Sequence, residues 1–115
     1  MSWMASTLFF VRDVGAAIDF YVGRLGFTLN MRYEEEGKAR VAGVSRGEGC
    51  ALLLTDQWPD KVGAGVLYTA LGKEDFDRAC AEFEANGVAV EEGFWGKPTL
   101  IVTDPAGNQI YFARP

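Results

Sequence analysis

Histidine is absent from the 115 residues of this chain. It is the side chain whose ordinary pKa lies nearest neutrality, and it is the commonest ligand of transition metals in proteins. Its absence excludes the Ser–His and Cys–His pairs that activate nucleophiles. Any metal site must therefore rely on carboxylate, thiolate, hydroxyl or carbonyl groups.

Cysteine is almost as scarce. The two cysteines, Cys50 and Cys80, form no CxxC motif and are too few for a disulfide framework. Cys80 falls on the apolar face of a predicted helix, and Cys50 falls within an apolar strand where no histidine can activate its thiol. We expect both side chains to be structural.

Long hydrophobic runs and a surplus of positive charge are also missing. No segment approaches the roughly 20 apolar residues that span a bilayer, and no basic cluster followed by an apolar run marks a signal peptide. Acidic residues outnumber basic ones by 16 to 11, which gives a net charge of −5. Binding to phosphate backbones requires the opposite balance. We expect a cytoplasmic protein without a nucleic-acid or membrane partner.

The chain does contain an ordered succession of strands and helices. A strand at 7–11 precedes a helix that Asp13 caps and that ends near Gly26, and strands follow at 27–33, 39–44 and 50–54. The same order then returns: a strand at 65–71, a helix from 75 to 86, and strands at 88–94, 99–103 and 109–112. We expect one domain over residues 1–115, with module one at 1–55, a linker at 56–63 and module two at 64–115.

The two halves also match locally in sequence. The segment from Val44 to Leu53 parallels the segment from Val102 to Tyr111 without a gap. Each half has too few elements to bury its own apolar face, so stacking two units is required. The pattern predicts an α+β fold in which tandem βαβββ modules form a curved mixed sheet around a concavity, with the helices outside.

Strand alternation assigns side chains to the two faces of this sheet. Phe9 and Val11 should lie under the first helix, as Leu100 and Val102 should lie under the second. The remaining positions of these strands should face the concavity: Ser6, Leu8, Phe10, Thr99, Ile101, Thr103, Gln109 and Tyr111. Such a mixture of aromatic, aliphatic and hydroxyl groups is typical of small-molecule pockets. The alternative is a concavity that its own side chains fill or that a dimer covers.

Four motifs, taken in order, resemble the vicinal oxygen chelate superfamily, also called the glyoxalase/bleomycin resistance/dioxygenase superfamily. They are Phe10-Val11-Arg12-Asp13, Asp19-Phe20-Tyr21 followed by Leu25-Gly26-Phe27, Phe94-Trp95-Gly96-Lys97, and Thr103-Asp104-Pro105-Ala106-Gly107-Asn108. The third is similar to the WG turn of the bleomycin-resistance branch. The resemblance covers nearly the whole chain and implies the duplicated fold.

The resemblance also implies where a metal would be held. Enzymes of this superfamily bind a divalent metal in the concavity, and the corresponding positions here are Ser6, about Leu53, Leu67 or Tyr68, and Tyr111. Serine, leucine and tyrosine do not form the carboxylate or imidazole sets that divalent metals prefer. We therefore expect no metal and no cofactor.

The leading hypothesis is a metal-free protein that sequesters an aromatic or amphipathic small molecule. As in the drug-resistance branch, we expect a homodimer with the pocket at or near its seam. The candidate ligand-binding residues are Trp95, Tyr111, Tyr68, Phe10, Trp58 and Ser6, and no catalytic residue is assigned. Trp95 either stacks on the ligand or packs over the sheet edge, and Trp58 either covers the pocket or anchors the linker.

Two alternatives belong to other functional classes. One is a lyase, isomerase or dioxygenase of the same superfamily with an atypical or absent metal site, in which Tyr68, Tyr111 or a glutamate transfers a proton. The other is an interaction subunit whose concavity is filled by large side chains such as Phe10 and Tyr111.

Overall fold

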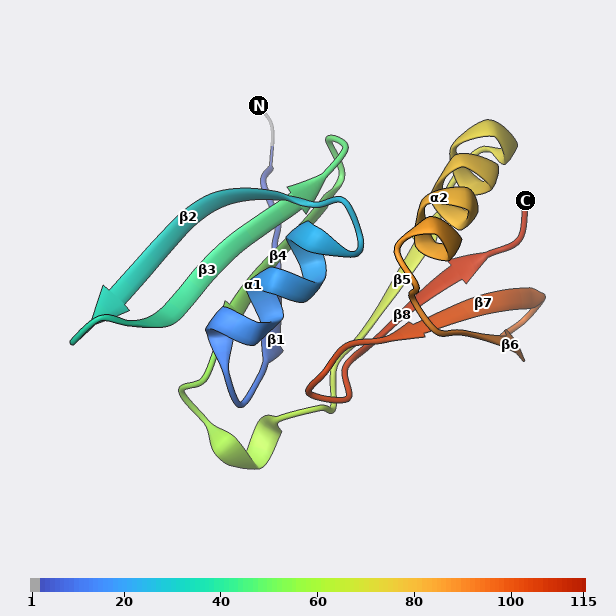
Figure 1. Ribbon diagram of the computed structural model, residues 1–115. Coiled ribbons are helices and arrows are strands. Elements are labelled where there is room, and N and C mark those ends of the chain that lie inside the picture. Colours follow the sequence, from blue (N-terminus) through green and yellow to red (C-terminus); the bar gives the residue numbers. More distant parts are fainter. Residues whose placement is uncertain (1–2) are drawn as a thin grey trace.

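A computed structural model describes residues 3–115 of the chain. Eight strands and two α-helices follow one another in two similar groups (Figure 1). Their bounds are β1 (Thr7–Phe10), α1 (Val14–Gly23), β2 (Thr28–Glu35), β3 (Lys38–Arg46), β4 (Cys50–Thr55), β5 (Val66–Ala70), α2 (Lys73–Ala85), β6 (Val90–Phe94), β7 (Pro98–Thr103) and β8 (Gln109–Ala113). A single 3₁₀ turn, Pro59–Lys61, lies in the connection between the groups.

The strands form two four-stranded mixed sheets of the same topology. The orders are β1-β4-β3-β2 and β5-β8-β7-β6, and in each sheet the first pair is parallel while the others are antiparallel. This confirms the predicted α+β fold of two βαβββ units. The structure differs from the predicted single curved sheet in one respect. Its two sheets stay open and separate, since within residues 3–115 no strand of one sheet pairs with a strand of the other.

Strand register is the same in both halves. Val44 pairs with Leu52 in the N-terminal sheet, and Val102 pairs with Ile110 in the C-terminal sheet. These four residues are fully buried. The gapless match in sequence therefore reflects two hairpins with one register, because a shift of one residue would turn these side chains to the opposite face.

Helix α1 begins where the sequence predicts and ends slightly earlier. The Asp13 carboxylate accepts a hydrogen bond from the Ala16 N–H at 3.1 Å, which satisfies one of the free donors of the first turn. Val14, Ala17, Ile18 and Tyr21 are buried, whereas Val22, predicted on the same apolar face, is partly exposed. The last helical residue is Gly23, and Gly26, near which the sequence predicts the helix end, has a φ of +76°.

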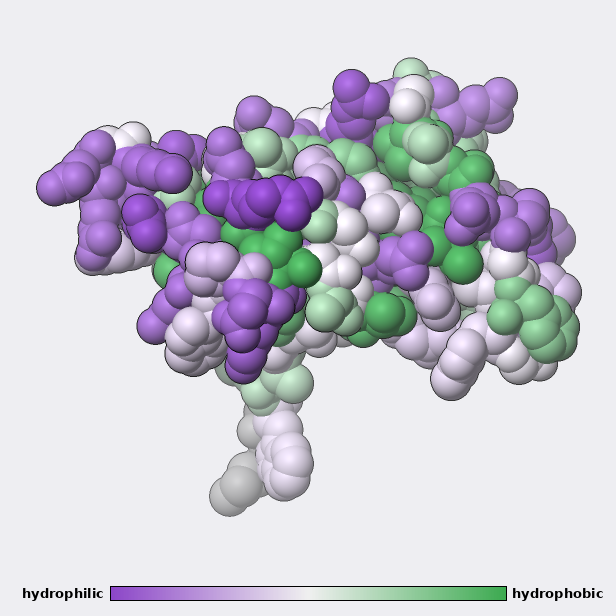
Figure 2. All heavy atoms as spheres, turned by 90° about the horizontal axis from the view of Figure 1, so that it is seen from below, coloured by the Kyte–Doolittle hydropathy of each residue, from purple (hydrophilic) through white to green (hydrophobic). Residues whose placement is uncertain are grey.

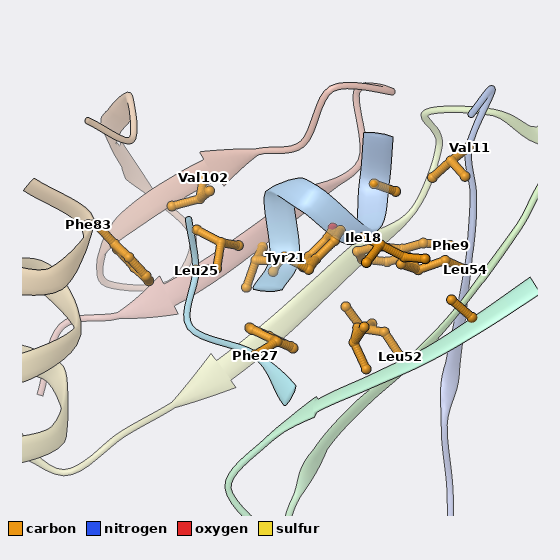
Figure 3. Close-up of a cluster of buried hydrophobic side chains, with 14 of the residues drawn as sticks. Phe9, Val11, Ile18, Tyr21, Leu25, Phe27, Leu52, Leu54, Phe83 and Val102 are labelled. Atoms are coloured by element: carbon orange, nitrogen blue, oxygen red, sulfur yellow. The ribbon is translucent and has the colours of Figure 1, made fainter. Parts of the chain in front are cut away.

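The hydrophobic core lies between the two sheets, around α1. Figure 3 shows Phe9 and Leu54 on one side of Tyr21 and Ile18, with Val102 and Phe83 on the other. Helix α2 covers the C-terminal sheet with Phe76, Ala79 and Phe83. Each sheet thus has an inner face, turned toward this core, and an outer face, turned away from it.

A buried polar network joins the halves at one end of the core. The Asp104 carboxylate accepts hydrogen bonds from the Tyr21 hydroxyl at 2.9 Å, the Asn108 side chain at 3.2 Å, and the backbone N–H groups of Ala106 and Asn108. The Asn108 amide in turn donates to the Phe10 carbonyl oxygen and accepts from the Gly65 N–H. We call this set, Tyr21, Asp104 and Asn108, the inner network.

The connection between the halves approaches this network closely. A Cβ added at Gly65 would lie 2.6 Å from the Phe9 ring, so a larger residue there would displace a core side chain. Gly63 has a φ of +79°, and an added Cβ would lie 2.5 Å from the Ala106 carbonyl oxygen. Glycine is therefore required at both positions for the linker to pass against the core.

Exposed contacts join the halves at the other end. Arg46 donates to the Leu25 carbonyl oxygen at 2.7 Å and pairs with Glu82 at 2.5 Å. Arg24 donates to the carbonyl oxygens of Asn86 and Gly87. Both arginines remain in contact with solvent, so these contacts stabilise the arrangement less than the inner network does.

Candidate functional site

Large hydrophobic side chains are exposed on the outer faces of both sheets. Those exposed by two fifths or more on these faces and their turns are Leu8, Met31, Tyr33, Val66, Tyr68 and Trp95. Val90 and Phe94 are also exposed, but they lie on the other side of the edge strand β6, where Val90 pairs with buried Val102. Figure 2 shows one side of the molecule, where hydrophobic side chains reach the surface in separate patches and hydrophilic ones gather at the β2–β3 end. Exposed apolar patches of this kind indicate candidate binding faces.

The outer face of the C-terminal sheet presents one continuous row across all four strands. Tyr68 pairs with Tyr111, Tyr111 with Ile101, and Ile101 with Glu91. This register decides the choice left open by the sequence: Tyr68 lies opposite Tyr111, while Leu67 pairs with buried Ile110 on the inner face. Of the adjacent glutamates, Glu91 is on the outer face and Glu92 pairs with Arg114.

Trp95 extends this row from the β6–β7 turn. Its ring centroid lies 5.5 Å from that of Tyr68, and the two rings are tilted by 55°. Trp95 is 62% exposed, so much of its surface stays accessible beside Tyr68. Tyr68, Tyr111 and Trp95, three of the six predicted ligand-binding residues, are thus brought together, and we call them the aromatic row.

The equivalent row of the N-terminal sheet is aliphatic. Leu8 pairs with Leu53, Leu53 with Gly43, and Gly43 with Met31. A Cβ at Gly43 would touch both Met31 and Leu53, which shows that these side chains meet over the glycine. Met31 and Tyr33 were not predicted as site residues, although the alternation of β2 could have placed them on this face.

Phe10 and Trp58 form a second aromatic pair beside the aliphatic row. Their ring centroids are 5.8 Å apart, and the Lys61 ammonium lies 4.7 Å from the Trp58 ring and 5.5 Å from the Phe10 ring. A cation over a ring face is held by the ring quadrupole. Trp58 therefore anchors the 3₁₀ turn to β1 while about half of its surface stays accessible. Lys61 had no predicted role.

Ser6 lies just before β1 and is exposed, on the same side as Leu8 and Phe10 by alternation. Thr99 differs from its prediction, because it is fully buried and its hydroxyl donates to the Lys97 carbonyl oxygen. Ile101 and Thr103 do reach the outer face, where Thr103 accepts a hydrogen bond from Gln109. Among residues 3–115, no aromatic ring contact joins the aromatic row to the Phe10–Trp58 pair.

The residues at the superfamily's metal positions do not fit a divalent metal. Ser6, Leu53, Tyr68 and Tyr111 contribute two phenols, one hydroxyl and no carboxylate, and Glu91 stands two strands from Tyr111. Oxygen-binding cations require several carboxylate or carbonyl ligands, and transition metals prefer imidazole or thiolate. Within the described part of the chain, no three His, Cys, Asp or Glu side chains lie together as a metal site.

Both thiols have raised pKa values. Burial raises the pKa of Cys50, an effect that Arg46 partly offsets, and burial likewise raises the pKa of Cys80, where Arg114 acts in the opposite direction. A raised pKa lowers the thiolate fraction and therefore slows the reaction of the thiol with electrophiles at neutral pH. In the region that the structure describes, no helix is long and apolar enough to cross a membrane.

The sequence model of the Glyoxalase/Bleomycin resistance protein/Dioxygenase superfamily matches residues 3–112. The chain belongs to this superfamily. The predicted resemblance is therefore confirmed over nearly the full length of the protein. Among curated proteins, no significant match was found.

Solved structures of this superfamily have the same fold. An antibiotic binding protein from Streptomyces sp. CB03234, TnmS3, is 28% identical with a TM-score of 0.74, covering 100% of this chain and 98% of its own. A bleomycin-binding protein from Streptomyces verticillus, solved with copper(II)-bleomycin, is 22% identical with a TM-score of 0.74 over the same shares. A lactoylglutathione lyase from Agrobacterium tumefaciens is 22% identical with a TM-score of 0.70, covering 99% and 94%. The fold thus occurs in both binding proteins and enzymes.

Proposed function

We propose that this protein binds and sequesters a small aromatic or amphipathic molecule without a metal, at a site built on the aromatic row. The observation that carries the proposal is the exposed Trp95 indole beside Tyr68, with Tyr111 and Ile101 continuing the row on the same strand face. Planar ligands gain both area burial and ring stacking on such a surface. The 28% identity to an antibiotic binding protein supports this class of ligand.

We further propose that two copies of the chain complete the site. In a single chain, each outer face can form only one side of a pocket. In a dimer, the aliphatic row of one copy would form the second side, opposite the aromatic row of the other copy. Ligand pockets bury most of their ligand, which one open sheet face cannot do. A homodimer would also cover the exposed Leu8, Met31 and Val66 side chains. We place this dimer in the cytoplasm.

Tryptophan fluorescence tests the binding proposal. We expect planar aromatic antibiotics to quench the emission of the wild type and to raise its melting temperature. The matched variants Trp95→Phe, Trp58→Phe and Trp3→Phe identify the reporting indole, since the quenching should disappear only in Trp95→Phe. A panel in which no compound quenches or stabilises the protein would contradict the proposal.

An enzyme with an atypical site is the competing function, because the fold also occurs in a lyase. Metal analysis of protein purified without chelator separates the two. We expect substoichiometric Fe, Mn, Zn and Ni. One equivalent of any of these per chain would favour an enzyme over the proposed binding protein.

A further inference from the structure

We propose a second ligand site in this protein: the crevice between the two halves binds an apolar molecule that carries an ammonium group. The crevice lies between the β3–β4 turn of the N-terminal half and β5 with α2 of the C-terminal half, and its volume is about 490 Å³. In Figure 1 the β3–β4 turn and the start of α2 lie at the same end of the molecule. This proposal does not rest on the proposed function.

The crevice and the aromatic row share Tyr68 but no other side chain. The β5 side chains alternate, so Leu67 pairs with buried Ile110 on the inner face while Tyr68 pairs with Tyr111 on the outer face. The crevice is lined by Leu67 and Thr69 from the inner side of β5 and by Tyr68 at this edge strand. Tyr111 and Trp95 do not line it, so a ligand held there would be distinguished from one on the row by its independence of the Trp95 indole.

The floor of the crevice is apolar, and its size suits a small ligand. Phe27 enters from the N-terminal half, and Leu67, Leu71, Phe83 and Phe112 enter from the C-terminal half. Small-molecule sites commonly enclose roughly 300–1,000 Å³ with mainly apolar walls. The size and the apolar floor of the crevice therefore favour an apolar ligand over water as its occupant.

The charged side chains that line the crevice determine which polar group a ligand can carry. Arg46 is committed to Glu82 and to the Leu25 carbonyl oxygen, and Arg78 pairs with Glu74 and Asp75. Glu48, which also lines the crevice, forms no ion pair with any residue in the range 3–115. One carboxylate is thus left without a positive partner beside an apolar floor.

This imbalance favours a cationic head over an anionic one. A carboxylate head, as in a fatty acid, would meet Glu48 as a like charge while both arginines remain engaged. An ammonium head would find Glu48 within the mouth, and the net charge of −5 on the chain adds attraction at long range. The crevice thus selects for amphipathic amines.

The alkylation rate of Cys50 can report whether a ligand occupies the crevice. Its partly buried thiol lines the crevice, whereas Cys80, which is also partly buried, does not line it. Alkylation by iodoacetamide, quantified at both residues by peptide mass spectrometry, therefore contains its own control. Octylamine, octanol and octanoate, each below its micelle concentration, give three probes with one apolar body and different heads.

We expect octylamine to slow Cys50 alkylation at least fivefold, octanol to slow it less, and octanoate to have little effect, with Cys80 unchanged. Glu48→Gln should remove about a threefold preference for the amine over the alcohol, in line with an exposed ion pair. Equal protection by all three probes, no protection, or equal protection of Cys80 would overturn the proposal.

A cavity-filling variant locates the site. A Cβ added at Gly49, in the crevice lining, or at Gly23, outside it, meets no atom within 4 Å, so both accept a larger side chain. Gly49→Trp should abolish the octylamine protection, and Gly23→Trp and Trp95→Ala should preserve it. Loss of protection in Trp95→Ala, with retention in Gly49→Trp, would assign the amine to the aromatic row and overturn the second site.

Discussion

The inner and outer faces of the two sheets use the same strands in opposite ways. On the inner faces Val44, Leu52, Val102 and Ile110 are buried around α1, and within residues 3–115 no buried side-chain polar atom lacks a hydrogen-bond partner. On the outer faces, residues such as Tyr68 and Met31 are exposed to solvent.

At the aromatic row, the difference separates stability from ligand binding within single strands. An inner side chain contributes through burial and hydrogen bonds that the chain makes with itself. An outer side chain contributes little to the free energy of unfolding of one chain and remains available to a ligand or another copy. Substitutions on the two faces should therefore affect different measurements.

Asp104→Ala should have the largest effect on stability. Removing the carboxylate leaves the Tyr21 hydroxyl and two backbone N–H groups without their acceptor, and the Asn108 amide keeps only its bond to the Phe10 carbonyl oxygen. We expect a loss of about 3–5 kcal/mol in the free energy of unfolding, measured by urea denaturation. Asp104→Asn, which keeps the shape, should lose less, and equal losses for both variants would argue against the network.

Tyr21→Phe should have an intermediate effect. The ring and its packing against Phe27 remain, and only the hydroxyl that donates to Asp104 is removed. We expect a loss of about 1–2 kcal/mol by urea denaturation. In a double-mutant cycle, adding Tyr21→Phe to Asp104→Ala should cost clearly less than it does in the wild type. Additive losses would show that the two residues do not interact.

Alkaline pH provides a further test of the same residue. Burial and the neighbouring Asp104 raise the pKa of the Tyr21 hydroxyl far above its ordinary value of 10.0. Above pH 10 the unfolded chain releases this proton and the folded chain retains it, so stability falls as pH rises. Between pH 10 and 11 the wild type should lose up to about 1.4 kcal/mol more than Tyr21→Phe. Parallel pH profiles would contradict the assignment.

Arg46→Ala should have a small effect on stability despite the short distances of its contacts. The guanidinium and Glu82 are both partly exposed, and solvent screens the pair. We expect a loss of about 0.5–1 kcal/mol by urea denaturation, which high salt should reduce. A loss as large as that of Asp104→Ala would abolish the distinction between the buried and exposed ends of the contact between the halves.

Trp95→Ala should have the smallest effect on stability and a large one on binding. The indole is mostly exposed, so the free energy of unfolding should change by less than about 0.5 kcal/mol. Loss of stacking and burial should weaken binding of a planar aromatic ligand about tenfold in a fluorescence titration. A strongly destabilised variant would show that the outer face is part of the core.

Much of the fold follows from local sequence rules. Asp13 caps α1 as predicted, Phe9 and Val102 are buried as alternation requires, and the gapless match between the halves gives the correct hairpin registers. These features depend on neighbours along the chain or on a period of two, which one sequence displays directly.

Contacts between distant segments could not be predicted. Tyr21 and Asp104 belong to two motifs far apart in the sequence, and the bond between them spans 83 residues, so nothing local indicates it. The choice between Leu67 and Tyr68 needed the parallel register of β5 and β8. Thr99 alternates onto the outer face and is nevertheless buried, because burial depends on the whole assembly of strands.

Native mass spectrometry with a planar aromatic antibiotic tests most directly whether the outer faces of two chains form the ligand site. We expect the wild type to retain ligand only in a species containing two chains, and Trp95→Ala to give the same two-chain species without ligand. Ligand retained on single chains, or retained equally by wild type and Trp95→Ala, would contradict the proposed site.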